Sequence, residues 1–266
     1  MSRLLVRGGT VYTDADRFAT ALLVEDGLVT WIGDDASAQR HVTESPGTDV
    51  LDLAGRLLTP AFADAGEPPG TPDDLIHAGV VARVERTPGA ELVTAGPDGQ
   101  VRPPAPGVVA VVDPRTLPAS VDLGAWAADG VPLALGTAPG WTLDPWDLLR
   151  HALARGLSAR AAFLAHTRGA WRAGGRGLPG DGSPARLYVG APATFVVWEP
   201  TELVTQVADT GRSTWSVDAR AGLPPLPRLG ALDEPGWHGP AADVVQVDGA
   251  VAFPDTDATR RAVIPP

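Results

Sequence analysis

The chain changes character twice along its length, near residue 60 and near residue 184, and these changes limit the folds it can adopt. Before residue 60, short apolar runs alternate with Gly-Gly, Asp-Gly and Ala-Gly pairs, as where Ala21–Glu25 precedes Asp26-Gly27. Such pairs between apolar runs are signals for β-hairpins. Residues 1–59 are therefore predicted to form a small antiparallel β unit.

The middle segment, residues 60–184, alternates strand and helix patterns, which is typical of parallel α/β structure. Strands are expected over residues 57–63, 80–85, 108–112 and 132–135, and helices over 72–77, 123–129, 145–154 and 158–171. The third helix has a clear start, because Asp144 can cap it and Pro145 suits its first turn. No regular structure is predicted for residues 88–107, which are rich in Pro and Gly.

Residues 185–266 return to β character. Strands are expected over residues 194–198, 213–217, 244–247 and 250–253, whereas the prolines of residues 223–240 predict a loop. Residues 4–59 alone have too few strands to bury both faces of a sheet. We therefore expect an α/β plus β fold in which both chain ends build one composite β-sandwich.

Composition limits the partners. All 21 basic residues are Arg, and with 32 acidic residues the net charge is −11, so nucleic acid and anionic membranes are not expected to bind. The chain has no Cys and no Lys, which excludes thiol chemistry, a Schiff base and a carboxylated lysine between two metals.

Because no apolar leader or long apolar run is present, a cytoplasmic location is expected. The absence of Asn and the scarcity of Ile suggest a GC-rich bacterial genome.

Stretches at both ends of the chain carry a family likeness. Near the N-terminus these are Leu5–Tyr12, Val24–Val29 and Leu51–Ala65; farther along they are Gly130–Gly136, Leu143–Trp146, Ser158–Gly169 and Val189–Trp198. Together they resemble the amidohydrolase superfamily, in its N-substituted formamide deacylase-like branch. The likeness covers roughly residues 3–66 and 107–253.

The resemblance implies a TIM barrel that holds zinc through a His-x-His pair after the first strand, further ligands from the middle strands, and an Asp after the eighth strand. Here the positions of the pair are Gly66 and Pro68, and the stretch where the Asp is expected reads Gly136-Thr137-Ala138. The side chains of Gly66 and Pro68 cannot bind a metal, and the carboxylate that would orient the attacking water is absent. We therefore predict that the ancestral zinc site is lost and that the protein uses no cofactor.

The length of the middle segment also predicts an incomplete barrel. An eight-stranded α/β barrel typically needs about 250 residues, whereas residues 60–182 amount to roughly half of that. Only about 40 residues separate Gly66 from Gly107, so the middle strands have no counterpart. A shortened, incomplete TIM-barrel-like domain with exposed strand edges is expected, and such edges favour a homodimer or binding to a full-length relative.

Six residues are candidates for a remnant or new site. Asp64, Glu67 and His77 have the ligand types of a rewired metal site, although acids near Asp73 also suit a helix start. Trp141 and Trp146 are candidates for lining a small pocket, or for simply covering the open barrel. His166 is the best-placed remaining imidazole, in a helix expected to pack on the barrel.

Three functions stay open at this point. The first is a pseudoenzyme, inert for the ancestral reaction, that acts as a scaffold or partner. The second is a hydrolase of carbon–nitrogen (non-peptide) bonds in N-acyl or formamide-type substrates, with a new site. The third is a small-molecule binding protein that uses a pocket near Trp141.

Overall fold

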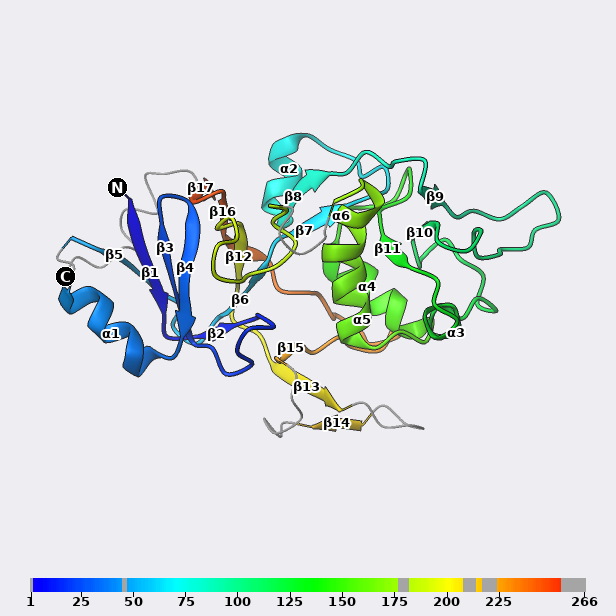
Figure 1. Ribbon diagram of the computed structural model, residues 1–266. Coiled ribbons are helices and arrows are strands. Elements are labelled where there is room, and N and C mark those ends of the chain that lie inside the picture. The colour runs from blue at the N-terminus through cyan, green and yellow to red at the C-terminus, as the bar shows by residue number, and fades with distance from the viewer. Residues whose placement is uncertain (1, 45–46, 177–181, 208–213, 217–223, 255–266) are drawn as a thin grey trace.

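The computed structural model describes residues 2–44, 47–176, 182–207, 214–216 and 224–254. Figure 1 shows an antiparallel-rich sheet toward one end of the molecule and short parallel strands with most of the helices toward the other. A second antiparallel-rich sheet lies between these two parts.

The first sheet has the order β4-β3-β1-β5, with β1 at Arg3–Arg7, β3 at Ala21–Glu25, β4 at Leu28–Gly33 and β5 at Asp49–Asp52. One face packs on helix α1 (Asp35–Glu44) through Leu5, Leu23 and Ala38. The prediction of β structure alone was wrong for this helix. Its sequence is polar, so it lacks the apolar periodicity that would mark a helix, and Asp34 accepts a hydrogen bond from Ser37 N at its start.

The second sheet pairs strands from both ends of the chain. Its order is β17-β16-β12-β6-β2, with β2 at Thr10–Val11, β6 at Leu57–Pro60, β12 at Phe195–Trp198, β16 at Ala242–Val247 and β17 at Ala250–Phe253. Phe195 and Val197 join a buried cluster with the first sheet, whereas Val196 and Trp198 join the core under the helices. Because successive strand residues face opposite ways, this sheet is the central layer of the fold.

Two Asp-Gly turns fasten the two sheets together. Asp26-Gly27 follows β3 and Asp248-Gly249 follows β16, and all four residues have positive φ, as a type I′ turn requires. Ala193 donates its N–H to Gly27 O (2.8 Å) and accepts from Gly249 N (3.0 Å). A Cβ atom on Gly249 would lie 2.3 Å from Gly27 Cα, so the turns meet backbone to backbone.

Five parallel strands form the second half of the molecule. β7 (Phe62–Asp64) pairs with β8 (Val80–Arg83), and β10 (Val109–Val112) pairs with β9 (Ala90–Leu92) and β11 (Leu133–Leu135). Backbone bonds from Ala65 N to Leu135 O (3.5 Å) and from Glu67 N to Thr137 O (2.7 Å) join β7 to β11. The strands therefore lie in the order β8, β7, β11, β10, β9.

The predicted strands near residues 80, 108 and 132 are confirmed, and the segment 57–63 divides at Ala61 between β6 and β7. Strand β9 lies where no structure was predicted. It is held by pairing with β10, which no local pattern reveals.

The helices follow the predicted ranges closely: α2 at Pro72–His77, α3 at Leu123–Ala128, α4 at Pro145–Ala154, α5 at Ala159–Leu164 and α6 at Ala170–Ala173. Between α5 and α6, residues Ala165–Gly169 form a π-helix. A Cβ on Gly169 would lie 2.2 Å from Leu133 O, so glycine lets this turn touch β11.

The remaining strands are β13 (Leu203–Val207), β14 (Thr214–Ser216) and β15 (Leu226–Pro227). The two-residue β15 lies in the segment predicted as loop, and the outer residues of the predicted strand 213–217 fall outside the described ranges. No helix within those ranges combines the length and apolar character needed to cross a bilayer.

The contact between the two turns predicts unequal effects of glycine substitution. Gly55 and Gly249 have nearly the same φ (82° and 84°), but a Cβ on Gly55 meets nothing within 4 Å. Gly55→Ala is expected to lower the free energy of unfolding by about 1 kcal/mol, and Gly249→Ala by about 2 kcal/mol more, because of overpacking. Urea unfolding measures both, and equal losses would contradict the contact.

Candidate functional site

The carboxyl ends of the parallel strands are where α/β proteins hold their ligands. Asp64 ends β7, Asp113 directly follows β10, and Thr137 lies just after β11. All three side chains are buried. This end of the parallel strands is therefore a candidate functional site.

The Asp64 carboxylate has its oxygens engaged by its own neighbours. Oδ1 accepts from Gly66 N at 2.8 Å and from Thr137 N at 2.9 Å, and Oδ2 accepts from Thr137 Oγ1 at 2.7 Å. His166, from the π-helix, places Nε2 3.8 Å from Oδ2. Burial acts to raise the pKa of Asp64, but His166 and the hydrogen bonds from Thr137 outweigh it, so this pKa lies below its ordinary value.

The strand ends touch at two glycines directly beside this carboxylate. A Cβ on Gly66 would lie 2.3 Å from Thr137 O, and a Cβ on Gly136 would lie 2.1 Å from Gly66 N. No side chain fits at either position without moving the backbone. Backbone atoms thus fill the space into which a ligand side chain at residue 66 would have to extend.

A second buried charge pair lies at the same end of the strands. Arg115 donates Nε to Asp113 Oδ1 (2.9 Å) and Nη2 to Asp113 Oδ2 (2.8 Å), and Ala138 N donates to Asp113 Oδ2 (2.8 Å). Trp141 is 42% exposed, with the Arg115 guanidinium 5.1 Å from its ring centre. The sequence analysis missed this pair, although an Asp directly after a predicted strand, with Arg two residues on, could have suggested it.

Of the six predicted residues, the structure brings together Asp64 and His166. Glu67 pairs with Arg86 (3.5 Å), and His77 lies against the ring of Phe253 (4.6 Å between centroids). Trp146 is buried in the core, edge-on to Phe62 and Trp198 (5.3 and 4.9 Å).

The donor set near Asp64 does not fit the zinc site that the resemblance implies. Asp64 and His166 supply two donors, and the Asp64 oxygens already accept hydrogen bonds from the chain. Catalytic zinc sites use about three protein ligands. No cluster of three or more acidic or histidine side chains with metal-binding geometry occurs in the described part of the chain.

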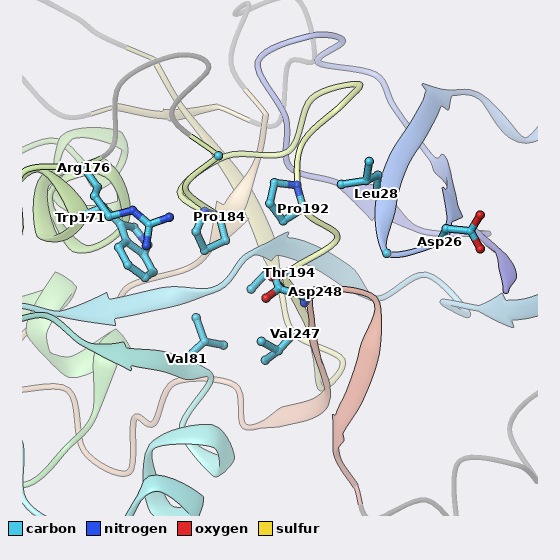
Figure 2. Close-up of a pocket in the computed structure, with 12 residues that line it drawn as sticks. Asp26, Leu28, Val81, Trp171, Arg176, Pro184, Pro192, Thr194, Val247 and Asp248 are labelled. Carbon is cyan, nitrogen blue, oxygen red and sulfur yellow. The ribbon is translucent and has the colours of Figure 1, made fainter. Parts of the chain in front are cut away.

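A cavity of about 470 Å³ lies elsewhere, between the Asp-Gly turns and helix α6. Figure 2 shows Trp171, Arg176 and Pro184 on one side, Thr194 and Asp248 across from them, and Val81 and Val247 below. Asp248 Oδ1 accepts from Thr194 Oγ1 at 3.1 Å, and the Arg176 guanidinium lies 5.1 Å from the Trp171 ring centre. Its size suits a small molecule, and its lining includes none of the six predicted residues.

No protein-family model matches this chain, and no curated protein matches its sequence. Solved structures of amidohydrolase-superfamily proteins do match it. N-isopropylammelide isopropylaminohydrolase from Burkholderia multivorans is 13% identical with a TM-score of 0.56, over 94% of this chain and 98% of that one. Guanine deaminase from E. coli is 15% identical with a TM-score of 0.54, over 96% and 100%. An amidohydrolase from Thermotoga maritima is 12% identical with a TM-score of 0.55, over 95% and 100%.

These likenesses show that the mixed α/β fold of this chain is similar to the TIM-barrel-like fold of those proteins. At these identities they describe architecture alone.

The Asp64 contacts predict a pH-dependent loss of stability. Asp64→Asn is expected to lower the free energy of unfolding at pH 7 by about 3 kcal/mol, because it removes one partner of a buried pair. Since the folded-state pKa lies below the unfolded value, the carboxylate stabilises the fold above about pH 4, and this contribution is lost as the pH falls through the folded pKa. The difference between variant and wild type should therefore shrink in acid.

Urea unfolding at a series of pH values down to about 2.5 tests this expectation. Asp49→Asn, at an exposed position in β5, is the control and should change stability by less than about 0.5 kcal/mol. A difference between Asp64→Asn and wild type that does not vary with pH would refute the role assigned to the charge.

Proposed function

We propose that this chain is a catalytically inert protein with the amidohydrolase fold, which acts as a scaffold or as a partner of another protein. The observation that carries the proposal is the backbone contact of Gly66 with Gly136 and Thr137. It leaves no room for a ligand side chain at residue 66, at the strand end where enzymes of α/β-barrel architecture hold their substrates. The Asp64 carboxylate serves there as an internal anchor and is sealed from solvent.

The proposal includes the finer architecture expected from the sequence. In it, residues 1–59 and 185–266 build one composite β-sandwich, and residues 60–184 form a reduced barrel. The pairing of β6 with β12 and the buried cluster that spans both sheets support this division. Placement in the formamide deacylase-like branch rests on the sequence motifs.

The main alternative is a hydrolase of carbon–nitrogen bonds. It is favoured by the fold, since the similar structures are a deaminase, an aminohydrolase and an amidohydrolase. A small-molecule binding protein is the second alternative, and the cavity in Figure 2 would be its site.

We expect the purified protein, incubated with zinc and dialysed, to retain no stoichiometric metal and to hydrolyse no N-acyl, formamide or cyclic amide substrate. The reason is that Asp64 and His166 fall short of the ligands that a catalytic zinc needs. Elemental analysis and chromatographic detection of products are the measurements. Stoichiometric zinc, or turnover abolished by His77→Ala or His166→Gln, would establish the hydrolase alternative.

The partner is proposed to be a second copy of this chain or a full-length relative. Strands β8 and β9 are the outer members of the parallel row, and an apolar groove of about 220 Å³ runs beside β8, lined by residues of α2 and β8 that include Leu75, Ile76 and Val81. Unpaired strand edges beside apolar surface favour association.

Light scattering is expected to give about twice the chain mass of 27.5 kDa at high micromolar concentration. A monomer at that concentration would exclude the homodimer.

A further inference from the structure

Three arginines converge on one carboxylate near the start of β7. Asp14, in the loop between β2 and β3, contacts Arg160 of α5 and Arg186 of the loop before β12, each at 3.3 Å through Nη2. Arg168 of the π-helix donates Nη2 to Asp14 Oδ2. Three positive charges thus face one negative charge, in a chain whose net charge is −11.

The surplus positive charge acts on Arg168 itself. Burial lowers the pKa of Arg168, and repulsion from Arg186 lowers it further. The side chains of all four residues are between 26% and 34% exposed, so the outer face of the cluster reaches solvent. Each guanidinium has five N–H groups in a fixed fork, and contact with a single carboxylate leaves most of them available.

The inner face of the cluster holds unused donors. Tyr12 is 3% exposed, and its Oη has no hydrogen-bond partner among the described residues, as is also true of Arg168 Nε and Arg186 Nε. Tyr12, Asp14, Arg168 and Arg186 line a cavity of about 10 Å³, which has room for about one water molecule, so a larger anion would contact the solvent-facing side of the cluster. Burial raises the pKa of Tyr12, which keeps its hydroxyl protonated and able to donate.

We propose that Arg160, Arg168 and Arg186 form a binding site for a dianionic phosphate group, with Asp14 as an internal carboxylate that competes for the same guanidinium groups. A dianion matches the two positive charges by which the three arginines exceed Asp14 among the described residues. Guanidinium forks bind phosphate oxygens in pairs, and such charge-assisted bonds are stronger than neutral ones. The site lies near Pro60, before β7 begins, whereas Asp64 ends that strand, so the proposal does not depend on the inert strand end.

Isothermal titration calorimetry with inorganic phosphate and with phenyl phosphate, at fixed ionic strength, tests this site. Asp14→Asn should tighten phosphate binding about tenfold, because a competing charge is removed. Arg186→Gln and Arg160→Gln should each weaken it about tenfold, and agreement between them guards against misfolding of either one. Tighter binding of phenyl phosphate would identify a phosphomonoester ligand, and equal binding would identify free phosphate.

The surface pair Asp98 and Arg102 (2.6 Å) provides the matched control, since it has one acid for one arginine. Asp98→Asn and Arg102→Gln should leave phosphate binding unchanged. The proposal is overturned if wild type binds neither probe, or if the Asp14 and Arg186 variants behave as this control pair does.

Discussion

A carboxylate that is sealed from water is stable only when its lone pairs are engaged, and the parallel half of this fold is arranged around that requirement at Asp64. Its partners come from the turn after β7, from the end of β11 and from the π-helix. Reaching them draws β7 and β11 so close that Gly66 and Gly136 have no room for side chains. A ligand side chain at residue 66 or 136 would therefore have to displace the backbone.

The second sheet couples this half to the rest of the molecule. Trp198 of β12 donates Nε1 to Thr59 Oγ1 (2.9 Å) and packs against Phe62 and Trp146, so the sheet and the helices share one aromatic core. Its opposite face supports the first sheet through Phe195 and Val197. A substitution in β12 therefore alters the packing on both faces of the second sheet, because closely packed cores have little space to adjust.

The sequence predicted those elements that have local signals. The α4 and α5 starts at Asp144 and Ser158 carry the expected capping bonds, to Asp147 N (3.0 Å) and Ala161 N (3.1 Å). Asp64 and His166 were both singled out from the sequence, but their contact with each other and the contact of Asp64 with Thr137 were not. Thr137 lies 73 residues away, and no local pattern records which strands become neighbours. The polar α1 and the three-residue β9 were missed because tertiary contacts hold them in place.

In the register of β6 against β12, Thr59 lies opposite Val196. Because these paired residues are far apart in the sequence, the fold has a high contact order. During synthesis, the apolar faces of β1, β3 and β6 leave the ribosome well before the strand that covers them has been translated. Closing such a wide loop is slow, and nascent chains with uncovered sheet faces are prone to aggregate. Production of this protein should therefore depend on translation rate and on holdase chaperones more than its modest size suggests.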